Sequence, residues 1–418
     1  MAGPDSRPST ATAARASSPR TEGASALNST RLLVYDAPEM NMPVGQVLKL
    51  AALLLLALPL FAAGRPAGAA DKPNKLADAA LARIGSEREP GAGLLVIADG
   101  KVAYLGARGV GDLQGMRPID GRTTFRLASV TKQFTAAAVM LLVRDGKLRY
   151  EDVLTDLFPG FPDYGRGITV RHLLNHTSGL PDYEELMPAA DPAVPVEQAQ
   201  IDDAGVLELL KAQKAGWFVP GALWRYSNSG YVLLGLIVAK VSGRSFPGFL
   251  QERIFGPLKM DNTVAFVRGR NRVPDRAFGH TKEDGRWRFT DQSPTSATLG
   301  DGGVYSSLYD LSIWDEALRR HLLLTEEEMA PALTPVRVRG KGPVGPDGKP
   351  ADYGFGWFLN AWQGHPRMWH YGETVGFRTA IERFTADGLT VIVLANRSDV
   401  DAPALALKVA GFYLKDGK

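Results

Sequence analysis

The segment FRLASVTKQFTAAAVMLLVRDGKL, residues 125–148, holds a serine and a lysine three positions apart, ahead of an apolar run. The residues before Ser129 are extended in character, and those after it are good helix formers with apolar side chains at helical spacing. The pattern predicts an extended segment that turns into a helix at Ser129, with Lys132 one turn later on the same face. An alcohol and an amine are therefore expected side by side at the start of one helix.

This placement suits nucleophilic chemistry. Free amide N–H groups and the positive end of the helix dipole favour an oxyanion at Ser129. The same field, burial and a cationic neighbourhood are expected to lower the pKa of Lys132 from about 10.4 to about 7–8, so that it can take the serine proton. The alternative is an ordinary helix start, in which the serine caps the helix and the lysine is solvated.

A second motif, Tyr226-Ser227-Asn228, is the only Y-x-N in the chain and lies in a polar turn before an apolar helix. A phenol beside a lysine can carry a proton to a leaving group, and an amide side chain can hold both the lysine and a substrate carbonyl. The structural alternative for Tyr226 is a buried, hydrogen-bonded core tyrosine.

A third motif, His370-Tyr371-Gly372, is the only H-x-G and lies where a strand pattern ends. A glycine there lets a substrate backbone approach the strand edge, which makes His370 and Gly372 candidates for substrate binding. The N–H of Glu373 can complete an oxyanion hole with that of Ser129. The structural alternative for His370 is a satisfied histidine at a strand end.

The order of elements predicts a sheet built from both ends of the chain. Residues 93–110 form two strand-like runs around Asp99-Gly100, which is a hairpin signal. Helical segments and loops dominate from about 130 to 325, and a last helix covers 402–414. Strand patterns return at 353–362, 366–372, 375–384 and 389–396. We therefore predict one domain over 71–418, with a helical insertion at about 140–300.

The N-terminal region differs from the rest in composition. Residues 1–39 are rich in Ser, Ala, Thr, Pro and Arg without periodicity, which predicts disorder or sequence upstream of a later start. Within 40–70, Lys49 precedes the apolar block LAALLLLALPLFAA, and small residues follow it. This pattern predicts a signal peptide and a periplasmic or secreted protein. An uncleaved anchor is the alternative, although the block is short for a membrane span.

Composition narrows the chemistry further. The chain has 418 residues, 45% of them hydrophobic, and a formal net charge of +3, which gives no support for nucleic acid binding. It has no cysteine, which excludes disulfides and cysteine nucleophiles, and its six histidines show no metal-ligand spacing. We expect neither a metal nor an organic cofactor; oligomeric state is left open.

Taken together, the motifs resemble the serine β-lactamase and penicillin-binding-protein superfamily. The resemblance covers about 75–415 and is closest to the branch with class C β-lactamases, D-Ala-D-Ala carboxypeptidases, D-aminopeptidases and β-lactamase-like esterases. It rests on the opening segment and on four further blocks in family order, ITVRHLLNHTSGLPDY (168–183), YSNSGYVLLGLIVAKVSGRSF (226–246), LGDGGVYSSLYDLSIW (299–314) and HYGETVGF (370–377).

The resemblance implies an α+β fold, a five-stranded antiparallel sheet flanked by helices with an all-helical part beside it and the site between them. It implies that Ser129 is acylated, that Lys132 is its base and that Tyr226 relays protons. Asn228 would orient the lysine and bind the substrate carbonyl, and His370 would stand where many members have the lysine of Lys-Thr-Gly.

The chain departs from that triplet, because it has no Lys-Thr-Gly. A histidine with a pKa near 6.5 is mostly neutral at pH 7 and holds a carboxylate weakly. The departure favours an esterase or D-aminopeptidase-like hydrolase that works through an acyl-enzyme on small esters, amides or peptides. The alternatives are a β-lactamase or D-Ala-D-Ala carboxypeptidase, and a non-catalytic module that binds a cell-wall peptide.

Other polar and aromatic residues are interpreted as structural. We expect His176 to hold a turn, and the glycines of 299–307 to accommodate backbone near the site rather than to bind phosphate. Four aromatic residues near the C-terminus alternate in strand fashion and are expected in the sheet core: Trp357, Phe358, Trp362 and Trp369.

Overall fold

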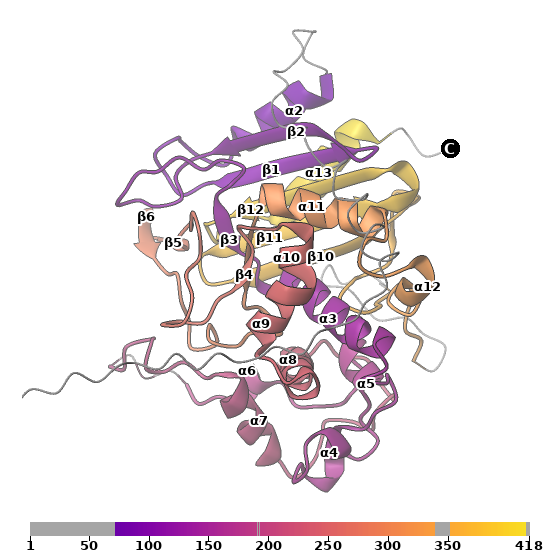
Figure 1. Ribbon diagram of the computed structural model, residues 1–418. Coiled ribbons are helices and arrows are strands. Elements are labelled where there is room, and N and C mark those ends of the chain that lie inside the picture. Colours follow the sequence, from indigo (N-terminus) through magenta and orange to yellow (C-terminus); the bar gives the residue numbers. More distant parts are fainter. Residues whose placement is uncertain (1–71, 190, 192, 339–351, 415–418) are drawn as a thin grey trace, which may run out of the picture. The chain divides into compact units, whose positions relative to one another are not determined.

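The computed structural model describes residues 72–414, except 190, 192 and 339–351 (Figure 1). The predicted disorder at 1–39 and the predicted signal peptide at 40–70 lie outside the described residues. Within the described part, no single helix has the length and hydropathy to cross a bilayer, although the helical segments Asn228–Ser242 and Phe246–Leu258 meet those criteria as a pair bent by 74°.

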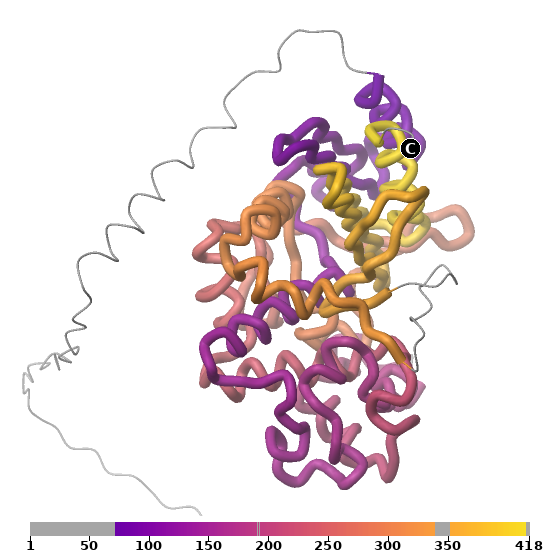
Figure 2. Tube along the Cα trace, turned by 90° about the vertical axis from the view of Figure 1, so that its right-hand side faces the viewer, coloured from indigo at the N-terminus to yellow at the C-terminus, as the bar shows by residue number. Residues whose placement is uncertain are grey.

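A five-stranded antiparallel sheet, ordered β10-β11-β12-β1-β2, joins the two ends of the described chain. Figure 2 shows the indigo N-terminal segment beside the yellow C-terminal one. The Asp99-Gly100 hairpin is confirmed, and both residues have the positive φ (51° and 74°) that such a turn requires. The strands are β1 (Ala92–Ala98), β2 (Lys101–Arg108), β10 (Met368–Thr374), β11 (Phe377–Phe384) and β12 (Leu389–Ala395).

Helices cover both faces of this sheet (Figure 1). Leu94, Val96 and Val391 pack with α2 (Lys72–Leu81) and α13 (Ala402–Tyr413) on one face. Alternate residues of the same strands join the core that contains α3 (Lys132–Arg144) and α11 (Leu308–Arg319) on the other face. Because both faces are buried, β1 and β12 are apolar along their length, which is why their sequences lack the alternation of a half-exposed strand.

The helical region follows β3 (Thr124–Arg126) and the short 3₁₀ turn η1 (Ala128–Thr131). Its long helix α8 is apolar all round and buried, so the other helices pack around it. The helices are α3 (Lys132–Arg144), α4 (Leu154–Leu157), α5 (Val170–Leu174), α6 (Tyr183–Leu186), α7 (Asp203–Lys211), α8 (Asn228–Ser242), α9 (Phe246–Leu250) and α10 (Gly256–Leu258), with one 3₁₀ turn η2 (Asp163–Gly165) and one π turn η3 (Gln251–Phe255).

The sequence predicts a helical insertion up to about residue 300, but the last part of that insertion contains strands. A hairpin of β5 (His280–Glu283) and β6 (Arg286–Phe289) turns at Asp284-Gly285, whose φ angles are again positive. The strands β4 (Val264–Ala265) and β7 (Val304–Ser307) form a small sheet with β3, in the order β3-β7-β4. This small sheet carries the extended segment that leads into η1.

The region after residue 307 corrects one further prediction. It begins with the helices α11 (Leu308–Arg319) and α12 (Glu326–Met329), and β8 (Ala361–Trp362), β9 (His365–Pro366) and the 3₁₀ turn η4 (Thr385–Asp387) follow them. The stretch 353–360 is a turn rather than a strand. A Cβ at Gly354 would lie 1.8 Å from the Ala332 carbonyl oxygen, and Gly356 has φ +77°, so the two glycines permit this turn.

Candidate active site

The chain turns sharply between β3 and α3, and this turn presents Ser129. Ala128 has φ 49°, a left-handed conformation that costs a residue with a side chain about 1 kcal/mol or more. The Leu127 N–H donates to the Val304 carbonyl oxygen at 2.9 Å, which ties the turn to the small sheet. The predicted passage from an extended segment to a helix is confirmed, with one 3₁₀ turn between them.

Lys132 is completely buried, and its ammonium group has three oxygen neighbours. Its Nζ lies 2.9 Å from Ser129 Oγ, 2.9 Å from Asn228 Oδ1 and 3.0 Å from the Asp301 carbonyl oxygen. The last two oxygens can only accept hydrogen bonds. A neutral amine at this position therefore donates both of its N–H groups to them and directs its lone pair at the Ser129 hydroxyl.

Burial lowers the pKa of Lys132 to about 8, against the opposing charges of Asp301, Asp182 and Glu184. The pKa of Lys132 is therefore lowered as expected, but only one of the expected causes, burial, contributes. A cationic neighbourhood is expected from the sequence, whereas the charges around this lysine are acidic. Desolvation alone lowers the pKa, because the ammonium form loses more hydration than the carboxylates return.

Tyr226 lies beside both residues. Its ring centroid is 4.8 Å from Lys132 Nζ, and its hydroxyl group interacts with the Ser129 side chain. Burial raises the pKa of the phenol well above 10, so the hydroxyl keeps its proton at neutral pH. Asn228 is the first residue of α8, and its backbone N–H donates to Asp182 Oδ2 at 2.6 Å, which holds the amide side chain towards Lys132.

His370 lies behind the cavity rather than in its wall. Its ring is fully buried; Nδ1 donates to the Tyr371 carbonyl oxygen at 2.7 Å and Nε2 accepts from the Tyr353 hydroxyl at 3.3 Å. Burial, and then the charge of Lys132, lower its pKa to about 3, so the ring is neutral. Direct substrate binding by His370 is not what this geometry offers; its neighbours Tyr371 and Glu373 line the cavity instead.

Gly372 is required, but by the protein's own packing. A Cβ at this position would lie 2.0 Å from the Leu127 carbonyl oxygen and 2.4 Å from Thr379 Oγ1. The sequence predicts a glycine here for the approach of a substrate backbone to the strand edge; in the structure the turn that presents Ser129 packs against its face. The glycine brings the edge strand β10 against η1, so Glu373 and Ser129 line the same cavity.

The cavity in front of Ser129 has a volume of about 190 Å³ and an acidic wall. Partial burial of its carboxyl group, together with the charges of Asp182 and Asp301, raises the pKa of Glu184 to about 7. Asp301 Oδ2 accepts from the Tyr183 hydroxyl, whereas its buried Oδ1 has no hydrogen-bond partner among the described residues. The lining residues are Arg126, Ala128, Ser129, Tyr183, Glu184, Tyr226, Asn228, Thr295, Thr298, Asp301, Gly302, Tyr371, Glu373 and Thr374.

The sequence did not predict the acidic residues of the site or Tyr353, the tyrosine at the start of the turn 353–360. Asp182, Glu184 and Asp301 stand in or beside quoted blocks, where only their glycine neighbours and His176 attracted attention. Tyr353 opens the stretch that was interpreted as a strand. Trp357, Phe358 and Trp369 are buried as expected, although Phe358 and Trp369 stack on each other at 4.7 Å in a separate cluster beside the cavity.

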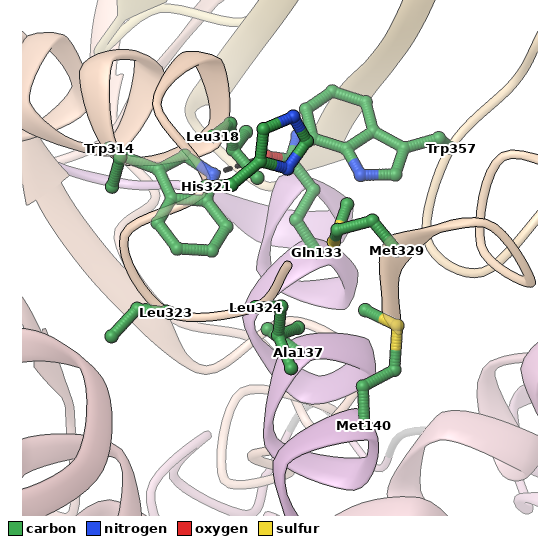
Figure 3. A pocket seen from close by; sticks show the side chains of 11 residues that line it. Gln133, Ala137, Met140, Trp314, Leu318, His321, Leu323, Leu324, Met329 and Trp357 are labelled. Carbon is green, nitrogen blue, oxygen red and sulfur yellow. Dashed lines mark hydrogen bonds between the residues drawn. The ribbon is translucent and has the colours of Figure 1, made fainter. Parts of the chain in front are cut away.

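A second, apolar pocket lies on another side of α3 and is distinct from this cavity (Figure 3). In it Trp314 Nε1 donates to Gln133 Oε1 at 3.0 Å, beside Met140 and Met329. Its volume of about 20 Å³ is enough for a single water molecule and too small for a substrate. The cavity at Ser129 is therefore the candidate active site.

An α+β fold with a serine, a buried lysine and a neutral tyrosine at one cavity defines a serine hydrolase. Comparison with known proteins places it further: residues 74–412 match the family model described as Beta-lactamase. The chain is also 32% identical over 346 residues to penicillin-binding protein 4* of Bacillus subtilis, covering 79% of this chain and 74% of that protein. It belongs to the beta-lactamase family, as the sequence resemblance had indicated.

The names of two other similar proteins indicate peptide or amide substrates. The chain is 29% identical to a D-aminopeptidase of Cereibacter sphaeroides over 74% of its own length, and it spans 57% of that longer protein. The structure resembles that of a D-amino acid amidase from Ochrobactrum anthropi with a TM-score of 0.67, at 25% identity, covering 82% of this chain and 95% of that one. The structural match confirms the predicted fold class.

Proposed function

We propose that this protein hydrolyses small amides and esters through an acyl-enzyme on Ser129. The observation that carries the proposal is the environment of Lys132 Nζ, where two acceptor-only oxygens leave the lone pair for the Ser129 hydroxyl. Lys132 takes the hydroxyl proton as Oγ bonds to the substrate carbonyl carbon. The oxyanion that forms is held by the backbone N–H groups of Ser129 and Glu373.

Tyr226 completes acylation. Its phenol is protonated and adjacent to both Ser129 and Lys132, so it can pass a proton to the leaving amine or alcohol while it regains one from Lys132. The bond between the carbonyl carbon and the leaving group then breaks. In the second step a water molecule gives a proton to the same pair of residues and attacks the ester carbonyl, which releases the acid and restores the Ser129 hydroxyl.

We further propose that the preferred substrates carry a free amine near the scissile carbonyl. The acidic wall of Glu184 and Asp301 supports this, because an ammonium group there gains two carboxylates. The guanidinium group of Arg126 lines the same cavity but donates to oxygens of Ser296 and Gly302. Amino-acid amides and N-terminal peptide residues have this amine, and the names of the D-aminopeptidase and D-amino acid amidase relatives favour the D-configuration.

A β-lactamase or D-Ala-D-Ala carboxypeptidase activity is less well supported. Both reactions use substrates with a carboxylate that the enzyme must hold. At the position of the expected cation the chain has His370, which is neutral and fully buried, and the exposed Glu373 stands on the cavity side of the same strand. A carboxylate in this cavity meets like charge.

Covalent labelling tests the nucleophile. The protein is incubated with a fluorophosphonate probe, and labelling is measured for the wild type, for Ser129→Ala and for Ser312→Ala, a serine on α11 that does not line the cavity. We expect labelling of the wild type and of Ser312→Ala, and none of Ser129→Ala. Labelling of folded Ser129→Ala at the wild-type level would refute the proposal.

A substrate panel tests the amine preference. It compares D- and L-amino-acid p-nitroanilides, their N-acetylated forms, p-nitrophenyl acetate and a chromogenic cephalosporin. We expect the free D-amino-acid derivatives to have the highest kcat/KM. Glu184→Gln should lower their kcat/KM about tenfold or more, the cost of one charge-assisted hydrogen bond, and leave p-nitrophenyl acetate unaffected. Equal rates for free and N-acetylated substrates would remove the amine from the proposal.

We also propose that the protein is exported. The support is the apolar block of residues 50–63 after Lys49, followed by the small residues up to 71. Expression of the full chain in a bacterial host, with fractionation and N-terminal sequencing, tests this. We expect a periplasmic or secreted form that begins between residues 64 and 71; a form that stays in the cytosol with residues 40–70 intact would contradict export.

A further inference from the structure

His176 combines a left-handed backbone conformation with a buried ring. It lies between α5 and α6 with φ 62°, in the left-handed region, and only 1% of its surface is exposed. Residues with a side chain adopt this conformation infrequently, and histidine is one of the types enriched in it. The turn therefore accounts for the backbone of His176 but not for the burial of its imidazole ring.

The contacts of His176 converge on the segment that carries Tyr226. Its carbonyl oxygen accepts from the Arg225 N–H at 3.0 Å, and its Nδ1 accepts from the Ser227 N–H at 3.2 Å. The two donors are the residues immediately before and after Tyr226. One residue thus binds the backbone on both sides of the tyrosine, once with its main chain and once with its ring.

The imidazole ring also packs against the phenol itself. The ring centroids of His176 and Tyr226 are 4.3 Å apart at an interplanar angle of 36°, and the ring of Tyr353 lies 4.6 Å away on the same histidine. The Tyr353 hydroxyl donates to His370 Nε2, so this support is itself held in place. The phenol of Tyr226 cannot turn towards His176 without a collision.

The hydrogen bonds also determine the tautomer of His176. Because Nδ1 accepts from Ser227, a neutral ring carries its proton on Nε2. That atom is buried and has no hydrogen-bond partner within the described residues, which leaves it against the surrounding aromatic rings. Burial and the charge of Lys132 lower the pKa of the ring well below 6.5, so the Nδ1 acceptor persists across the working pH range.

We propose that His176 is a positioning residue for Tyr226, which keeps the phenol hydroxyl at Ser129 through its ring and its Nδ1 acceptor. The proposal rests on the function proposed above for Ser129 and Tyr226. It differs from the sequence-based interpretation of His176, in which the histidine only holds a turn. A residue that only holds a turn would affect folding, whereas a positioning residue affects the acylation rate of the folded protein.

Two substitutions separate the two contacts of the ring. His176→Asn suits the left-handed backbone and keeps an acceptor oxygen but loses the ring, and His176→Phe keeps a ring but loses the acceptor. We expect each to lower the fluorophosphonate acylation rate and the kcat for p-nitrophenyl acetate by about 10- to 100-fold, as for a misplaced catalytic group, with KM little changed. His365→Asn is the matched control, since that ring pairs with Asp387 and does not line the cavity.

A double-mutant cycle with Tyr226→Phe distinguishes positioning from general damage. If His176 acts through the phenol hydroxyl, His176→Asn should add little further loss once that hydroxyl is absent. An equal loss in both backgrounds would overturn the proposal, as would wild-type acylation by folded His176→Asn and His176→Phe. An unlabelled wild type would instead refute the proposed function, so the two failures are distinguishable.

A measurement on the wild type makes the test independent of whether the variants fold. The ¹⁵N signals of the His176 ring report which nitrogen carries the proton. We expect the Nε2–H tautomer between pH 6 and 9, unchanged by the control substitution His365→Asn. An Nδ1–H tautomer or a doubly protonated ring would mean that Ser227 cannot donate to Nδ1, and the proposed link to Tyr226 would fall.

Discussion

On the sheet, buried guanidinium groups lie against carboxylates, whereas the buried ammonium group behind Ser129 lies against neutral oxygens. Arg383 Nε is 2.6 Å from Asp315 Oδ1, and Arg367 Nη1 is 2.8 Å from Glu382 Oε2. Lys132 Nζ meets a hydroxyl, an amide oxygen and a backbone carbonyl instead. The sheet pairs keep their charges compensated, and Lys132 is left with a proton that it holds weakly.

The contrast shows how one fold separates stability from reactivity. A buried cation with a direct carboxylate partner gains enough to remain charged, and removing that partner is costly. A buried cation whose nearest partners are neutral loses hydration without that compensation, so its pKa falls towards the working pH. Two substitutions and a titration test this contrast.

The largest effect is expected for Lys132→Met, which removes the amine and keeps similar volume. Acylation by the fluorophosphonate should fall between about 10²- and 10⁴-fold, because the serine loses its proton acceptor. The free energy of unfolding in urea should change by less than about 2 kcal/mol, since a poorly solvated charge is removed along with its hydrogen bonds. If the variant is unfolded without urea, Lys132 stabilises the fold in the same way as the buried pairs of the sheet, and the comparison is wrong.

Breaking a sheet pair should give the opposite outcome. Asp315→Asn leaves Arg383 buried without its carboxylate, and the free energy of unfolding should drop by about 3–5 kcal/mol. The labelling rate of the folded fraction should stay at the wild-type value. Asp163→Asn, in an exposed pair with Arg166, is the control and should leave the urea midpoint unchanged. A stable Asp315→Asn protein would contradict the comparison.

The smallest effect is a pH dependence. The acylation rate should rise about tenfold per pH unit below about 8 and then level off, as the neutral fraction of Lys132 grows. Because the pKa of Lys132 is lower in the folded than in the unfolded state, the unfolded chain binds the extra proton between about 8 and 10.5, so this residue adds stability as the pH rises through that window. A rate that is flat from pH 6 to 8 would argue against Lys132 as the base.

Local patterns predicted much of the fold. The pairing of Ser129 with Lys132 follows from helical spacing, and the Asp99-Gly100 hairpin follows from turn chemistry, so both are encoded within a few neighbouring residues. The Asp284-Gly285 dipeptide has the same turn chemistry, but it lies within the segment predicted to be a helical insertion. The turn at Gly354 and Gly356 resembled a strand, because its apolar side chains alternate while its backbone reverses.

The features of the site that the sequence did not predict depend on contacts between segments far apart in the chain. The acidic charges near Lys132 come from the loops at Asp182 and Asp301, and nothing in residues 125–148 indicates their sign. The burial of His370 depends on which face of β10 meets the aromatic residues after Tyr353. The packing of Gly372 against the Leu127 carbonyl oxygen is likewise visible only in three dimensions.

The pairing of β1 with β12 has a consequence for how the protein is made. The Gly91 N–H and the Asn396 side chain, 305 positions apart, meet at 2.8 Å beside that pair of strands. During synthesis the hairpin of β1 and β2 emerges early and waits, with an unpaired apolar edge, until nearly the whole chain has left the ribosome. Premature termination before β12 would leave that edge exposed and prone to aggregation, so a holdase chaperone has most to protect during this interval.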